Sequence, residues 1–204
     1  MSATGRLLER EEHDFYATPS WCVDRLLEHE AFNLSVFNTI VDPCAGDGAI
    51  LRTLRAHRTH LPKHTLAAFE IQARFKESLE SVADLVGIGD ALAFMPEYNG
   101  RGCIDLAITN PPFSLAFELL QALWPVAGRI ALLLRLSFIA SAKRHPFLKD
   151  RIPDVFVLPN RPIFVRGQSD NCDYGWFSWW PLAPDEGGHL YMLDLTPDKE
   201  RRLP

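Results

Sequence analysis

A strand, a turn and a helix are predicted in succession by Val41-Asp42-Pro43-Cys44-Ala45-Gly46-Asp47-Gly48-Ala49-Ile50. Gly46 and Gly48 let the backbone turn tightly and let a ligand approach it closely. The first N–H groups of the following helix would then face an anionic group. The third glycine of the dinucleotide-binding pattern is absent, because its place falls near Leu51, so the loop favours a ligand other than a nicotinamide dinucleotide.

Short apolar runs alternate with helix-compatible segments on both sides of this loop. Buried strands are predicted at Thr39–Asp42, Leu66–Glu70, Asp84–Ile88, Ile104–Thr109 and Arg129–Arg135. Helices are predicted at Trp21–Phe32, Ala49–Ala56, Arg74–Val82 and Ser114–Trp124. In the last of these, Ser114 is the expected cap and Glu118 lies near the positive end of the dipole. The alternation predicts an α/β fold of the doubly wound, Rossmann-like class, with a mostly parallel sheet covered on both faces.

Two late strands are expected to extend this sheet. Val155–Leu158 and Gly175–Trp180 are joined by a polar loop, which predicts a C-terminal antiparallel hairpin and a seven-stranded sheet. In the second of these strands Trp176, Trp179 and Trp180 would alternate between the two faces, with at least one of them in the core.

Composition limits the class of protein. Of the 204 residues, 47% are hydrophobic, and no apolar run reaches the length of about 18 residues that a membrane span needs. The four cysteines are scattered without a C-x-x-C pair, which argues against a disulfide framework and a zinc site. The first residues of the sequence have no signal-peptide pattern, so a cytoplasmic location, in a bacterium or a phage host, is expected. We expect one domain over 1–204, with tails at 1–12 and 183–204 and no separate target-recognition domain.

The net charge of −5 argues against a broad basic face for duplex DNA. Basic residues gather in two places only: Arg52, Arg55, Arg58 and Lys63, and Lys143, Arg144, Lys149 and Arg151. Such clusters are more often solvated helix faces, so any contact with nucleic acid is expected to be local or to come from a partner protein. His57, His60 and His64 are expected on a polar surface turn and not at a metal ion, because Pro62 breaks any helix there.

Polar side chains are predicted to gather at one edge of the sheet. Asp42, Glu70 and Asn110 end the first, second and fourth strands, and Asp90 follows the third. Because doubly wound sheets bind ligands at the carboxyl ends of their strands, these groups predict a ligand site. Glu70, 22 residues after Gly48, can accept both hydroxyls of a ribose, and Asp90 can accept a hydrogen bond from an adenine amine. The alternatives are a surface charge for Glu70 and a helix N-cap for Asp90.

The most informative stretch is Asn110-Pro111-Pro112-Phe113, directly after a predicted strand. Two prolines stop the strand and make the loop rigid. The Asn110 amide oxygen and the Pro111 carbonyl can then accept both N–H groups of an amine that is conjugated to a ring. Phe113 offers a flat face on which a base can stack. The alternative is a helix-start turn with Phe113 in the core.

With both motifs in place, the sequence resembles the class I S-adenosylmethionine-dependent amino-methyltransferases. The nearest resemblance is to gamma-type adenine-N6 DNA methyltransferases, including small phage and prophage enzymes. Asp42–Gly48 is similar to their glycine-rich cofactor motif and Asn110–Phe113 to their transfer motif. Asp14-Phe15-Tyr16-Ala17-Thr18-Pro19 resembles their N-terminal cofactor segment, and the order of the three motifs is that of the gamma type.

This resemblance implies the class I methyltransferase fold, S-adenosylmethionine as cofactor and methyl transfer to adenine N6 in DNA. It implies a cofactor site made of Tyr16, Thr18, Pro19, Asp42, Pro43, Cys44, Ala45, Gly46, Gly48, Glu70 and Asp90. It implies a transfer site made of Asn110, Pro111, Pro112 and Phe113, without a metal. The same chemistry on an RNA adenine or a protein glutamine amide stays open, as does a catalytically silent binding subunit. Cys44 needs no chemical role, because methyl transfer to an amine requires no thiolate.

Overall fold

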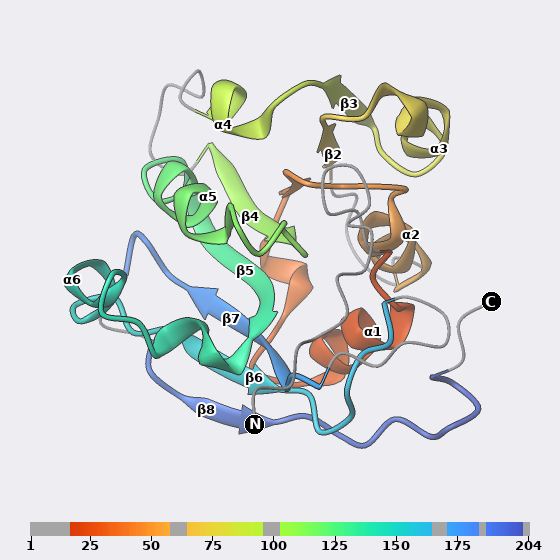
Figure 1. The fold of residues 1–204 in the computed structure, drawn as a ribbon. Helices are drawn as coiled ribbons and strands as arrows, with labels where there is room; N and C mark the ends of the chain where they lie inside the picture. The colour runs from red at the N-terminus through yellow and green to blue at the C-terminus, as the bar shows by residue number, and fades with distance from the viewer. Residues whose placement is uncertain (1–16, 58–64, 96–102, 165–170, 184–186, 202–204) are drawn as a thin grey trace, which may run out of the picture.

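The computed structural model describes residues 17–57, 65–95, 103–164, 171–183 and 187–201. They contain an eight-stranded sheet in the order β3-β2-β1-β4-β5-β7-β6-β8 (Figure 1). The strands are β1 (Thr39–Asp42), β2 (Thr65–Glu70), β3 (Leu85–Ile88), β4 (Ile104–Thr109), β5 (Ala127–Arg135), β6 (Asp154–Val157), β7 (Tyr174–Trp179) and β8 (Leu190–Met192). Neighbours among β1 to β5 are parallel, whereas β7 is antiparallel to both β5 and β6. The predicted parallel sheet and C-terminal antiparallel hairpin are therefore confirmed.

Helices cover both faces of the sheet (Figure 1). One buried cluster includes side chains of α1 (Ser20–Glu28), α2 (Ala49–Ala56) and α3 (Lys76–Glu80). The other includes side chains of α4 (Ala91–Phe94), α5 (Ala116–Leu123) and α6 (His145–Leu148). Short 3₁₀ turns lie at Leu34–Val36, Ala73–Phe75 and Leu136–Ile139. Among the described residues, no helix is long and apolar enough to cross a membrane.

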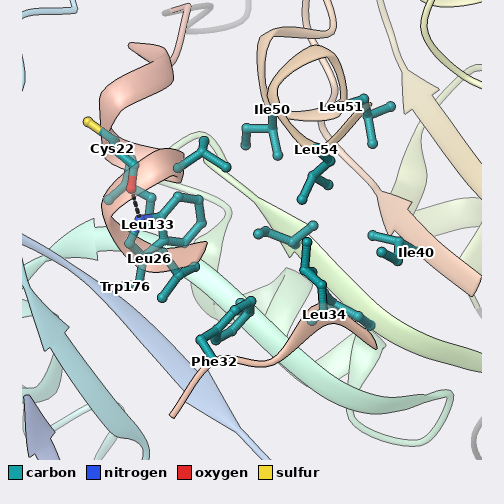
Figure 2. Close-up of a cluster of buried hydrophobic side chains, with 14 of the residues drawn as sticks. Cys22, Leu26, Phe32, Leu34, Ile40, Ile50, Leu51, Leu54, Leu133 and Trp176 are labelled. Atoms are coloured by element: carbon teal, nitrogen blue, oxygen red, sulfur yellow. Dashed lines mark hydrogen bonds between the residues drawn. The ribbon is translucent and has the colours of Figure 1, made fainter. Parts of the chain in front are cut away.

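Trp176 and Trp179 of β7 are buried on opposite faces of the sheet, as their spacing predicts. Figure 2 shows the cluster around Trp176, where its indole Nε1 donates a hydrogen bond to the Cys22 carbonyl of α1 at 2.7 Å. A buried indole N–H needs such a partner. The bond ties the first helix to a strand near the other end of the chain.

Two predicted helices are shorter in the structure. α1 ends at Glu28 and not at Phe32, because His29 is already extended and the chain turns there. The segment expected as one helix over Arg74–Val82 is a 3₁₀ turn at Ala73–Phe75 followed by α3, which ends at Glu80. In both places the apolar side chains reach the core without continued helix.

Ser114 does not cap α5. The helix begins at Ala116, and Leu115 N donates to the Pro112 carbonyl at 2.9 Å, so a turn separates the prolines from the helix. Glu118 does lie in the first turn of α5, as expected. The rigid Pro-Pro step sets this turn and delays the helix start by two residues.

An eighth strand lies in the segment that the sequence leaves as a C-terminal tail. β8 has only three residues, and Leu190 and Met192 are exposed, so no alternation of apolar and polar residues marks it. Parallel pairing with β6 forms this strand. Val155 N donates to His189 O at 2.8 Å, and Leu193 N donates to Val157 O at 3.0 Å.

Candidate active site

A cavity of about 420 Å³ opens at the carboxyl ends of β1, β2 and β4. Asp42 and Glu70 are the last residues of β1 and β2, Asp90 follows β3, Asn110 follows β4, and all four line the cavity. The strand order reverses between β1 and β4, which is where doubly wound sheets bind ligands. Its volume lies within the usual range of small-molecule sites.

Most of the predicted site residues line this cavity: Thr18, Asp42, Pro43, Cys44, Ala45, Gly46, Glu70, Asp90, Asn110 and Pro112. Pro19, Gly48, Pro111 and Phe113 lie outside the lining, and Tyr16 lies outside the described residues. The lining also includes twelve residues that were not predicted: Ala17, Asp47, Ala49, Ile50, Ile71, Gln72, Gly89, Ala91, Leu92, Ser114, Leu115 and Leu119. Seven of these twelve are direct chain neighbours of a predicted residue, so including the residues on either side of each predicted one would find them.

The glycine loop is held against β2. Gly46 N donates to Glu70 Oε2 at 2.8 Å, and Ala45 N donates to the Phe69 carbonyl at 2.9 Å. Gly48 has a φ of 86°, and a Cβ there would lie 2.7 Å from Val82 Cγ2. Gly48 therefore allows close packing behind the loop and does not face the cavity.

The start of α2 offers fewer open N–H groups than the sequence suggests. Asp47 Oδ1 accepts the Ala49 N–H at 3.1 Å. The protein's own carboxylate thus occupies part of the position expected for an anionic ligand group.

Glu70 is buried, at 6% exposure, so it is not a surface charge. Its Oε1 accepts the Gln72 N–H at 2.8 Å, and its Oε2 accepts the Gly46 N–H. Each carboxylate oxygen has two lone pairs, so further hydrogen bonds to a ligand hydroxyl remain possible. Glu70 thus braces the glycine loop at the position predicted for a ribose contact.

Asp42 is a buried carboxylate, and only one of its two oxygens accepts a hydrogen bond from a described residue. Its Oδ1 accepts the Cys44 N–H at 3.2 Å, whereas neither Oδ2 nor the buried Thr109 hydroxyl has a hydrogen-bond partner within 3.5 Å among the described residues. Burial raises the pKa of Asp42 to about 7, although the Thr109 hydroxyl and the Cys44 N–H act to lower it; the carboxylates of Glu70 and Asp47 add smaller raising effects. A buried acceptor without a partner is costly, and a ligand that donates a hydrogen bond or carries positive charge removes that cost.

Asp90 does cap a helix, as the alternative interpretation holds. Its Oδ1 accepts the Leu92 N–H at 2.9 Å at the start of α4. The same side chain is exposed and lines the cavity. A cap uses one carboxylate oxygen, so both interpretations of Asp90 are compatible in this geometry.

Asn110 is tied to the N-terminal segment. Its Nδ2 donates to Thr18 Oγ1 at 3.1 Å, across 92 residues of sequence. Thr18 is buried, and Asn110 is half-buried at the cavity wall. This bond directs the other amide atom, Oδ1, away from Thr18 as a hydrogen-bond acceptor.

Phe113 packs against other side chains and does not line the cavity. Its ring packs against that of Tyr174, with centroids 5.8 Å apart, and the Arg135 guanidinium lies 4.8 Å from its centroid. Arg135 Nε donates to Tyr174 Oη at 3.3 Å. Phe113 is half-buried at the edge of the core, so it is neither fully a core residue nor part of the cavity lining.

The remaining candidates have structural contacts. His57 Nε2 lies 2.8 Å from Asp24 Oδ1, and His60 and His64 lie outside the described residues. In the described parts of the chain, no group of three or more His, Cys, Asp or Glu is placed to hold a metal ion. Burial raises the pKa of the Cys44 thiol, as do Asp42, Glu70 and Asp90, so this thiol stays protonated.

Both basic clusters are partly used within the fold. Arg55 bonds to Val82 O and Asp84, and Arg151 stacks on Trp124 and Phe147, while Arg58 and Lys63 lie outside the described residues. Lys143 lies 3.8 Å from Glu118 of α5. The sequence predicts solvated helix faces here, whereas Arg55 and Arg151 make contacts within the fold.

Neither protein-family models nor curated proteins give a match to this sequence. Solved structures do. A candidate RNA methyltransferase from Pyrococcus horikoshii matches with a TM-score of 0.62 and 17% identity over 82% of this chain and 85% of that one. A candidate class I S-adenosylmethionine-dependent methyltransferase from Listeria monocytogenes matches with a TM-score of 0.56 and 13% identity, over 88% of this chain and 64% of that one. The methyltransferase subunit of a type I restriction-modification system from Streptococcus thermophilus matches with a TM-score of 0.58 and 15% identity, over 89% of this chain and 49% of that one.

Identities this low show the fold alone. The strand order, the antiparallel strands near the C-terminus and these likenesses agree with one another. The chain has the α/β Rossmann-like fold of the class I methyltransferases.

Proposed function

We propose that this chain is an S-adenosylmethionine-dependent methyltransferase that methylates the N6 amino group of adenine in DNA. The observation that carries the proposal is the position of Asn110. It lies directly after β4 at the wall of a cavity lined by acidic strand ends, and its side chain is oriented by the hydrogen bond to Thr18. An amide oxygen held in this way is suited to an amino acceptor. The resemblance of Asn110–Phe113 to the transfer motif of adenine-N6 methyltransferases supports the same acceptor.

The residues around the cavity fit S-adenosylmethionine, which carries a sulfonium, an amine and ribose hydroxyls. Asp42 Oδ2 is a buried acceptor without a described partner, and Glu70 and Asp90 add carboxylates along the same wall. These three residues and Gly46 would hold the cofactor, which when bound supplies an electrophilic methyl group. The protonated Cys44 thiol is a poor competing nucleophile.

Asn110 and the Pro-Pro turn provide the acceptor chemistry. The Asn110 Oδ1 accepts a hydrogen bond from the adenine amino group. The resemblance gives the carbonyl of Pro111, which is buried and outside the cavity lining, as the second acceptor. Both bonds draw the nitrogen lone pair out of conjugation with the ring. Alignment of the two reactants then supplies most of the rate, and no strong base is needed.

A nucleic-acid acceptor is supported by two of the similar structures, which are described as an RNA methyltransferase candidate and a restriction-modification subunit. The chain's net charge of −5 argues against a broad basic face for duplex DNA, so help from a partner protein in choosing the target sequence is part of the proposal.

The test is methyl-group labelling with the full chain. Purified protein is incubated with S-adenosylmethionine carrying a labelled methyl group and, separately, with DNA, RNA and a protein extract. We expect label in DNA that, after digestion to nucleosides, runs with N6-methyladenine. Asn110→Ala is the control and should transfer on the order of a hundredfold less label, or none.

Other results have definite meanings. Label that appears only in RNA or only in protein overturns the DNA assignment and keeps the amino-transfer chemistry. Measured cofactor binding without transfer to any fraction supports the silent-subunit alternative. Failure to bind the cofactor at all overturns the proposed function.

A further inference from the structure

The strand β8 forms one edge of the sheet and pairs on one side only within the described part of the chain (Figure 1). On its inner side it runs parallel to β6, and His189 O accepts the Val155 N–H at 2.8 Å. In such a ladder every second residue faces the neighbouring strand, so His189 and Tyr191 turn their backbone groups toward β6. The backbone N–H and C=O groups of Leu190 and Met192 therefore point to the outer edge, where a further strand can pair.

The side chains at this edge are apolar and exposed. Leu190 is 71% exposed and Met192 is 63% exposed, although a leucine or a methionine in a strand usually packs against a neighbour. Ile152, which is 59% exposed, continues the apolar strip, because its Cγ2 would lie 3.6 Å from a Cβ placed on Gly188. Edge strands of monomeric proteins usually carry a charge or a proline against pairing, and β8 has neither.

The opposite edge of the sheet differs. It is formed by β3, where Leu85 is the one large apolar residue of the strand with an exposed side chain. The exposed Asp84 directly precedes Leu85 and places a charge at that edge. Of the two edges, β8 is the one that lacks such protection.

We propose that two copies of this chain associate through β8, in an antiparallel pair about a two-fold axis at Tyr191. In this register Leu190 of each copy lies opposite Met192 of the other, and each such pair exchanges both of its outward backbone hydrogen bonds. The exposed apolar side chains then cover one another across the strands. A two-fold interface uses the same surface of both copies, and β8 is complementary to itself in this way.

The charges near β8 permit this register. Across the same axis His189 lies opposite Leu193 of the second copy, and Asp194 lies opposite Gly188. Like charges directly opposite each other would destabilise a strand pair, and none meet here.

The pairing leaves the cavity outside the interface. β8 runs in the same direction as β4 and β5, since β7 is antiparallel to both β5 and β6, and β6 is parallel to β8. An antiparallel second copy therefore opens its cavity at the opposite edge of the joined sheet. The inference does not rest on the proposed function, and ligand binding in the cavity should not depend on association.

The test is sedimentation velocity of the full chain at about 1–100 μM protein, a range in which small interfaces associate. Leu190→Lys/Met192→Lys places like charges opposite each other in the proposed register, whereas Leu190→Glu/Met192→Lys places opposite charges there. Leu85→Lys is the matched control, because it introduces the same charge at an exposed apolar residue of the other edge strand. Circular dichroism checks that each variant folds.

The wild type should pass from monomer to dimer as concentration rises and form nothing larger, because a two-fold interface closes on itself. Leu190→Lys/Met192→Lys should raise the dimer Kd by about tenfold or more, since each substitution occurs twice in the interface. Leu190→Glu/Met192→Lys should dimerise about tenfold more tightly than the two-lysine variant. Leu85→Lys should keep the wild-type Kd.

A wild type that stays monomeric over the whole range, or that forms larger assemblies, overturns the inference. So does an unchanged dimer Kd in Leu190→Lys/Met192→Lys, or an equal loss in Leu85→Lys. Equal Kd values in the two-lysine and the glutamate–lysine variants overturn the two-fold register. If Leu190→Lys/Met192→Lys does not fold, the single change Leu190→Lys takes its place, since that side chain is 71% exposed.

Discussion

The two halves of the cavity are held together over very different distances in the sequence. In the glycine-loop half, Asp42, Glu70 and Asp90 each accept the backbone N–H that lies two residues further along the chain. In the Asn110 half, the hydrogen bond from Asn110 to Thr18 spans 92 residues. The first half combines such local turns with the bond from Gly46 N to Glu70, which spans 24 residues, whereas the second half depends on the packing of more distant segments.

This difference predicts separable roles. Local hydrogen bonds set each carboxylate at its strand end before any acceptor is present, which suits tight binding of a constant cofactor. Long-range contacts hold Asn110 and Phe113, so their geometry depends on several elements at once. We therefore expect changes in the glycine-loop half to alter cofactor affinity and changes in the Asn110 half to alter turnover.

The largest expected effect is that of Asn110→Ala. Loss of the oriented amide oxygen should lower kcat by on the order of a hundredfold or more, as for other single groups that act on the transition state. Cofactor Kd should stay within about twofold of wild type, since Asn110 contributes no charge to that half. Single-turnover kinetics and calorimetry measure the two quantities. Asn33→Ala, an exposed asparagine at the Leu34–Val36 turn, is the control.

Glu70→Ala tests the other half. Removing the carboxylate leaves the buried Gly46 N–H without its acceptor, in addition to any lost ribose contact. Cofactor binding should weaken by about 1–3 kcal/mol, with a smaller change for Glu70→Gln, which keeps one acceptor oxygen. Calorimetry checks this, with exposed Glu77→Ala as control. Equal affinities in Glu70→Ala and wild type would place the cofactor elsewhere.

Asp42 makes cofactor affinity depend on pH. Burial raises its pKa to about 7, so the side chain is mostly protonated at pH 6 and mostly ionised at pH 8. A positively charged cofactor favours the ionised form, so affinity should rise with pH through this range. With a pKa of about 7, only about one molecule in eleven is ionised at pH 6, and Kd there should be roughly tenfold weaker than at pH 8.

Asp42→Asn is the matched control for this titration. It keeps an acceptor for the Cys44 N–H but cannot ionise, so its Kd should be nearly flat between pH 6 and pH 8. A wild type with an equally flat profile would show that the Asp42 charge has no part in binding.

The smallest expected effect is that of Thr18→Val, which removes the hydroxyl that orients Asn110 and keeps the shape of the side chain. A neutral hydrogen bond contributes about 0.5–1.5 kcal/mol, so kcat should fall by about three- to tenfold. Thr18→Ser should restore most of the rate, because the hydroxyl returns. If Thr18→Val instead weakens cofactor Kd and leaves kcat unchanged, Thr18 belongs to the glycine-loop half.

Features that depend on residues close together in the chain were predictable from the sequence. The glycine loop, the acidic strand ends and the Asn-Pro-Pro turn all depend on short stretches, since a strand end places its next residue at the edge of the sheet wherever the helices pack. Asp42, Glu70, Asp90 and Asn110 accordingly meet at one cavity.

Features that depend on which distant segments touch came only from the tertiary structure. The direction of Phe113 toward Tyr174, the Thr18 bond to Asn110 and the pairing of β8 with β6 join residues whose spacing carries no periodic signal. Their partners are chosen by packing of the whole sheet and its helices, because a side chain's neighbours across a core are set by the positions of several elements at once. Local chemistry thus specified which side chains gather at the cavity, and tertiary packing specified how the Asn-Pro-Pro turn faces it.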